Sequence, residues 1–137
     1  MLLPVRDAAA TLRACLDSLA GQTLADHEVI AVDDGSRDGG AATLDARARE
    51  DPRLVVLHAP PRGLVAALQA ALVRARAPIV ARMDADDVSH PDRLRQQVER
   101  LERDRSVDVL GSRVRLAGPA GEPPGEGAHG LHLLGLD

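Results

Sequence analysis

Apolar and polar positions alternate along the chain in blocks that are typical of successive helices and strands. Residues 28–36, EVIAVDDGS, form a short apolar run closed by turn residues, which predicts a buried strand. Before it, apolar residues recur at helical spacing over residues 8–22, and Asp7 is placed to cap the start of that predicted helix. Its buried face would consist of Leu12, Cys15, Leu16 and Leu19.

The same alternation continues along the rest of the chain. Further helices are predicted near 39–49, near 64–76 and from Pro91 onward, where a proline suits the first helical turn because it lacks an N–H. Further strands are predicted at 53–58, 78–84 and 107–112.

Strands that alternate with helices predict an α/β fold with a mostly parallel sheet covered on both faces, a Rossmann-like three-layer α/β/α arrangement. Ligands bind such sheets at the carboxyl ends of the strands. We expect one domain over residues 1–115. The Gly- and Pro-rich segment 116–137 is predicted to be a loop or a disordered tail.

Composition narrows the function classes. The chain has 137 residues and a net charge of -4, which argues against nucleic acid or an anionic membrane surface as the main partner. No apolar run approaches the roughly 20 residues of a transmembrane helix, so a cytoplasmic location is expected, with the inner face of the membrane as a peripheral alternative. All 17 basic residues are arginine, and the absence of lysine excludes a P-loop. It also counts against a receiver-type phosphoryl-transfer domain.

Two acidic clusters follow predicted strands directly. Asp33 and Asp34 end one strand, and Asp84, Asp86 and Asp87 follow another. A parallel sheet would bring both clusters to the same edge, where like charges raise one another's pKa unless a cation neutralises them. Carboxylate oxygens favour Mg²⁺ or Mn²⁺, and a site with about two carboxylates leaves coordination positions for substrate phosphates.

A purely structural explanation stays open for these aspartates. DDGS is a good turn sequence, and Asp87 or Ser89 would serve as a cap for the helix predicted at Pro91. Two clusters at equivalent ends of neighbouring strands favour the metal site over the caps.

Four segments, in order and spacing, resemble the nucleotide-binding half of family 2 glycosyltransferases. They begin with LPVRDAAATLRACLDSLAGQT, which is similar to the segment that opens the family, and VDDGSRDGG follows at residues 32–40. RGLVAALQAAL covers residues 62–72, and ARMDADDVSHPDRLRQQV covers residues 81–98. The resemblance implies an A-type glycosyltransferase fold, seen here in its N-terminal part, that binds a nucleotide-diphosphate sugar through Mn²⁺ or Mg²⁺, with a UDP-sugar as the expected donor.

The resemblance also implies roles for individual residues. Asp34, and Asp33 with it, would hydrogen-bond the base, and Arg62 would add a phosphate contact. Asp84, Ala85 and Asp86 form the family's Asp-x-Asp motif, with Asp84 and Asp86 as metal ligands and Asp87 as an alternative ligand. The residues expected beside the nucleoside are Pro4, Val5 and Arg6.

An inverting enzyme of this family needs a carboxylate base that deprotonates the acceptor hydroxyl. The resemblance places that base in an acceptor-binding half downstream of the Asp-x-Asp motif, and we expect this chain to end before it, so the catalytic base stays unassigned. Two functions therefore stay open. The chain is either the donor half of a metal-dependent inverting glycosyltransferase or a non-catalytic nucleotide-sugar-binding fragment.

Overall fold

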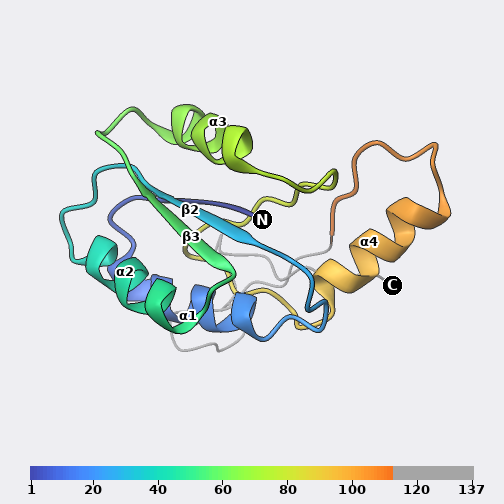
Figure 1. Cartoon of the computed structure of the whole chain (residues 1–137), viewed down its shortest axis with the longest axis horizontal. Helices are drawn as coiled ribbons and strands as arrows, with labels where there is room; N and C mark the ends of the chain where they lie inside the picture. The colour runs from blue at the N-terminus through green and yellow to red at the C-terminus, as the bar shows by residue number, and fades with distance from the viewer. Residues whose placement is uncertain (113–137) are drawn as a thin grey trace, which may run out of the picture.

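The computed structural model of the protein describes residues 1–112. Three parallel strands form a sheet in the order β1-β2-β3, and four helices accompany it (Figure 1). In chain order the elements are β1 (Leu2–Val5), α1 (Ala9–Ala20), β2 (Val29–Asp33), α2 (Gly40–Glu50), β3 (Leu54–His58), α3 (Leu64–Arg74) and α4 (Arg93–Arg103).

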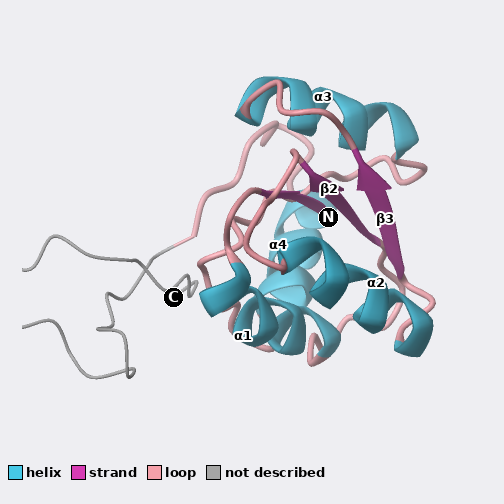
Figure 2. Cartoon of the chain, turned by 90° about the vertical axis from the view of Figure 1, so that its left-hand side faces the viewer, coloured by secondary structure: helices cyan, strands magenta, loops and turns pink. Residues whose placement is uncertain are grey.

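The sheet lies between two layers of helices, which confirms the predicted three-layer α/β/α arrangement (Figure 2). All five residues of β2 are buried, as the central strand of a covered parallel sheet requires. On one face, α3 packs Ala67 and Ala71 against Ile30 and Val32. On the other face, the core combines strand residues with α1 and α2 and contains Leu3, Val5, Leu12, Cys15, Leu16, Leu19, Ala31 and Leu44.

Most of the predicted elements are found close to their expected positions. The four residues predicted for the buried face of α1 are all buried, and Cys15 is a free thiol in the core. Two predicted helices, 39–49 and 64–76, correspond to α2 and α3. The fourth helix begins at Arg93, two residues after Pro91. Pro91 and Asp92 form a turn before it, and the carbonyl oxygen of Pro91 accepts a hydrogen bond from the Thr23 N–H at 2.9 Å.

Two predicted strands are wrong. Residues 78–84 pair with the sheet only through one parallel bridge, in which the Leu2 N–H donates to the Ala81 oxygen at 2.8 Å and the Met83 N–H donates to the Leu2 oxygen at 3.0 Å. Residues 107–112 form no strand, and Val109 remains 88% exposed because no described strand lies beside it. Residues 78–84 therefore meet β1 at a single bridge, and residues 107–112 have no strand partner among residues 1–112.

The predicted helix caps are also wrong, and long-range contacts take their place. Asp7 does not cap α1; the Ala9 N–H donates instead to Asp38 Oδ2 at 2.6 Å, while Asp38 Oδ1 accepts from the Gly40 N–H at 2.9 Å. One carboxylate thus accepts one backbone N–H from the first turn of each of the two helices, α1 and α2.

At α4, neither Asp87 nor Ser89 acts as the cap. The Leu94 N–H donates to Oε1 of the buried Gln22 at 3.1 Å, and Gln22 Nε2 donates to the His90 oxygen at 2.8 Å. The amide of Gln22 therefore ties the end of α1 to the start of α4.

Within residues 1–112, no helix is long and apolar enough to cross a bilayer.

Candidate functional site

A cavity of about 630 Å³ opens where β1 and β2 end. Both acidic clusters reach it, as the sequence predicts for a parallel sheet: Asp34 comes from the end of β2, and Asp84 and Asp86 come from the segment after the single bridge to β1. Its volume lies in the range of small-molecule sites, roughly 300–1,000 Å³. Further lining residues include Pro4, Val5, Arg6, Asp7, Thr11, Gly63, Leu64, Arg82 and Ala85.

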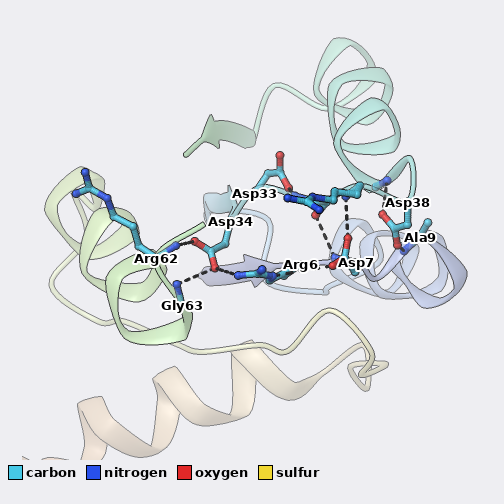
Figure 3. Close-up of polar contacts among 11 residues, drawn as sticks. Arg6, Asp7, Ala9, Asp33, Asp34, Asp38, Arg62 and Gly63 are labelled. Carbon is cyan, nitrogen blue, oxygen red and sulfur yellow. Dashed lines mark hydrogen bonds and ion pairs between the residues drawn. The ribbon is translucent and has the colours of Figure 1, made fainter. Parts of the chain in front are cut away.

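Asp34 joins three parts of the cavity wall (Figure 3). Its carboxylate accepts from the backbone N–H groups of Arg62 at 2.7 Å and Gly63 at 2.9 Å, and from Arg6 Nη1 at 3.2 Å. The Arg62 N–H contributes most to lowering the pKa of Asp34, burial opposes it, and Gly63 and Arg6 lower it further. Asp34 is therefore an anion that fixes the start of α3 and holds Arg6.

Arg62 contributes to this contact through its backbone. Its side chain is exposed and points away from Asp34 in Figure 3, and it does not line the cavity.

Asp33 also points away from the cavity. Its Oδ1 accepts from the Ser36 N–H at 2.9 Å, and its Oδ2 lies 3.2 Å from His58 Nδ1. Burial opposes ionisation of Asp33, but the hydrogen bonds from Ser36 and His58 outweigh it and lower the pKa of the carboxyl. The two adjacent aspartates thus have different surroundings: Asp34 faces the cavity, whereas Asp33 fixes the turn behind it.

The turn that follows Asp34 requires glycine at position 35. Gly35 has φ of +73°, and a Cβ there would lie 2.8 Å from Pro61 Cδ. Nearby, Asp7 also has a positive φ, +49°, and its Oδ1 accepts from the Arg37 N–H at 2.7 Å. This hydrogen bond holds the loop after β2 against the loop after β1.

The second acidic cluster contains one neutralised carboxylate. Asp84 is paired with Arg82, whose Nη2 lies 2.7 Å from Oδ1 and 2.9 Å from Oδ2. Asp86 is exposed. Asp87 is half-buried, and burial first, then the charges of Asp86 and Asp84, raise its pKa.

His58 bridges two carboxylates behind the site. Its Nδ1 faces Asp33, and its Nε2 lies 3.0 Å from Asp45 Oδ1 on α2. Hydrogen bonds with Asp33 and then Asp45 raise the pKa of His58 above its ordinary value of 6.5, against some desolvation.

This bridge predicts a pH-dependent contribution to stability. Because the pKa of His58 is raised in the folded state, its stabilisation is complete below the unfolded value of 6.5 and is lost as pH rises through the folded pKa. The lowered pKa of Asp33 sets the acid limit: its stabilisation is present above 3.8 and is lost as pH falls through the lower folded value.

We expect His58→Gln to lower the thermal midpoint more at about pH 5.5 than at about pH 8.5, measured by far-UV circular dichroism. His90→Gln, at an exposed histidine outside this bridge, is the control. An equal loss at both pH values would contradict a charged bridge.

Sequence reasoning missed Arg82 and Asp7, which both line the cavity. The only signal for Arg82 is its position two residues before Asp84, a spacing that by itself does not predict an ion pair. Asp7 was interpreted as a helix cap, and only its positive φ turns its carboxylate towards the next loop.

The sequence was compared with known protein families and matches one of them over most of its length. The sequence model of Glycosyl transferase family 2 matches residues 1–124. The bifunctional glycosyltransferase pgtA of Dictyostelium discoideum is 34% identical over 106 residues, which cover 74% of this chain and 14% of pgtA. The chain therefore spans well under half the length of this curated relative.

Solved structures agree on the fold. The mannosyltransferase PcManGT from Pyrobaculum calidifontis, in complex with GDP-Man and Mn²⁺, matches with a TM-score of 0.69 and 27% identity over 86% of this chain and 35% of that one. S. aureus TarS 1-349 in complex with UDP matches with a TM-score of 0.68 and 21% identity over 86% and 39%. The described chain thus has the A-type glycosyltransferase fold.

Proposed function

The chain belongs to glycosyl transferase family 2, and on that premise we propose that it is the donor-binding part of an enzyme that transfers a sugar from a nucleoside diphosphate to an acceptor. One observation carries the proposal: Asp34, Asp84 and Asp86 meet at a single cavity at the carboxyl ends of parallel strands. That is the place and the chemistry that a nucleoside diphosphate with a divalent cation requires.

The residues present fit a cation that the donor completes. Asp84 and Asp86 offer carboxylate oxygens at the cavity. Asp87, which follows Asp86 in the sequence, is the alternative ligand. Among residues 1–112, no three His, Cys, Asp or Glu side chains converge into a metal cage of their own. Two carboxylates suit Mn²⁺ or Mg²⁺ that takes its remaining ligands from phosphates and water. When bound there, the cation would neutralise charge on the departing nucleoside diphosphate.

The opposite side of the cavity suits the nucleoside. Asp34 already accepts three hydrogen bonds, and a carboxylate has about four acceptor positions, so it retains capacity for one N–H donor of a base. Pro4 and Val5 form the adjoining wall at the end of β1, and Arg6 adds a positive charge beside it. The backbone N–H groups of Arg62 and Gly63 hold the Asp34 carboxylate in place, so it can accept a hydrogen bond from an incoming base without rearrangement.

Neither Asp33 nor the side chain of Arg62 lines the cavity, so the proposed donor site does not include them.

The relatives support the donor class. PcManGT was solved with GDP-Man and Mn²⁺, and TarS with UDP. For this chain we propose a nucleotide-diphosphate sugar, with a UDP-sugar as the first candidate, and metal-dependent transfer with inversion. The acceptor and the catalytic base belong to the whole protein's activity and stay open, as does the predicted cytoplasmic location.

The alternative function predicted from the sequence, a non-catalytic nucleotide-sugar-binding fragment, would use the same donor site. Turnover of a nucleotide sugar, rather than its binding, separates the two functions.

The test is a calorimetric titration of the full chain with UDP and with GDP, each with and without Mn²⁺. We expect binding of at least one nucleotide that requires the cation. A folded sample that binds neither nucleotide in Mn²⁺ would contradict the proposal. Calorimetry suits this protein because it has no Trp, Tyr or Phe for intrinsic fluorescence.

A further inference from the structure

Arg82 occupies a fixed point of the backbone at the cavity. The residues on either side of it are hydrogen-bonded to Leu2 of β1, and its own carbonyl oxygen accepts from Arg93 Nη2 at 2.7 Å. Met83, which follows it, is buried. The Arg82 side chain, by contrast, is half exposed and lines the cavity. The backbone is therefore held in place while the guanidinium is able to change partners.

The present partner of that guanidinium is Asp84. Nη2 contacts both carboxylate oxygens, at 2.7 and 2.9 Å, and Nε lies 3.2 Å from Oδ1. These are the same two oxygens that Asp84 would offer to a divalent cation. Arg82 and a cation at Asp84 therefore compete for one carboxylate.

This ion pair contributes little to the fold. The two side chains are 52% and 43% exposed and lie two residues apart in one segment, so the pair joins no separate elements. Exposed pairs of this kind stabilise proteins only slightly. Breaking the pair therefore costs the folded protein little free energy.

The balance of charge at the cavity determines when the ion pair of Arg82 and Asp84 should break. A cation that displaced Arg82 in the absence of a donor would leave two positive groups side by side with only the nearby aspartates to neutralise them. A diphosphate that arrives with the cation gives the released guanidinium a matching anion, and arginine is well suited to phosphate oxygens because of its planar array of donors. The second arginine at the cavity, Arg6, is already held by Asp34.

We propose that Arg82 is a positioning residue that covers Asp84 in the absence of donor and turns to the donor diphosphate when cation and donor bind together. The inference rests on the proposed function. It makes cation and nucleotide binding mutually dependent, because each relieves the charge that the other leaves unpaired.

The test compares Arg82→Gln with the parent in two titrations of the full chain. With Mn²⁺ alone, the variant should bind the cation roughly threefold to tenfold more tightly, since the competing guanidinium is gone. With UDP, or GDP if that is the nucleotide bound, in saturating Mn²⁺, the variant should bind roughly tenfold more weakly, since a charge-assisted contact to phosphate is lost. These opposite shifts distinguish a change of partner from a structural role.

Two further variants keep the test decisive. Arg82→Lys retains the charge without the planar fork and should lie between parent and Arg82→Gln in both titrations. Arg95→Gln, which removes an arginine paired with Asp92 and Glu99 on α4, should change neither.

Unchanged or weaker Mn²⁺ binding in a folded Arg82→Gln protein would overturn the inference while leaving the proposed function intact, provided that the parent binds nucleotide with Mn²⁺. A folded parent that binds no nucleotide would overturn both.

Discussion

Replacing Asp86 by alanine is expected to weaken Mn²⁺-dependent nucleotide binding roughly 100-fold, because truncating one member of a close charge contact in a binding site typically costs about 2–5 kcal/mol. Asp86 is exposed at the cavity. Its loss should therefore leave the thermal midpoint near that of the parent while the nucleotide affinity falls. Calorimetric titration with UDP or GDP in Mn²⁺ measures the effect.

Asp26→Ala is the matched control, since it removes the same charge at an exposed position that does not line the cavity. It should leave the affinity unchanged. Equal nucleotide affinity in Asp86→Ala and the parent would remove the basis for a cation at Asp84 and Asp86.

The largest stability effect is expected for Leu12→Ala. Leu12 is completely buried between α1 and the sheet, where the cluster that surrounds it includes Val5 and Leu44. Removing a buried leucine side chain costs about 2–5 kcal/mol through lost transfer free energy and the remaining cavity. This is a large part of the roughly 5–15 kcal/mol by which domains are stable. Urea unfolding followed by far-UV circular dichroism measures the difference.

Leu72→Ala makes the same chemical change in α3, where the side chain is 52% exposed. It should change the free energy of unfolding by less than about 0.5 kcal/mol. Similar losses in both variants would show that the core does not lie where the packing of α1 places it.

Sequence patterns sufficed for elements whose signal is local. The apolar stripe of α1 and the continuous apolar run of β2 each predict burial from their own spacing, and both are buried. The meeting of Asp34 with Asp84 and Asp86 was also predicted from the sequence. The segment before Asp84 is not a strand, but its one parallel bridge to β1 is enough to bring it to the edge where β2 ends.

The errors involve contacts between residues far apart in the chain. The apolar pattern of residues 78–84 indicates a strand, but whether it forms one depends on neighbouring strands, and among residues 1–112 it pairs only with β1, at one bridge. The hydrogen bonds from Ala9 to Asp38 and from Leu94 to Gln22 replace local caps with partners 29 and 72 residues away. The direction in which Asp33 faces likewise depends on His58, which lies 25 residues later.

The Asp38 carboxylate has a consequence for the way in which the molecule opens. Its two oxygens accept from the first turns of different helices, Ala9 of α1 and Gly40 of α2. Fraying of either helix start therefore releases half of a shared acceptor and weakens the other start. The amide hydrogens of these two turns should exchange with solvent in one cooperative event, so that the starts of α1 and α2 behave as a single unit of local unfolding.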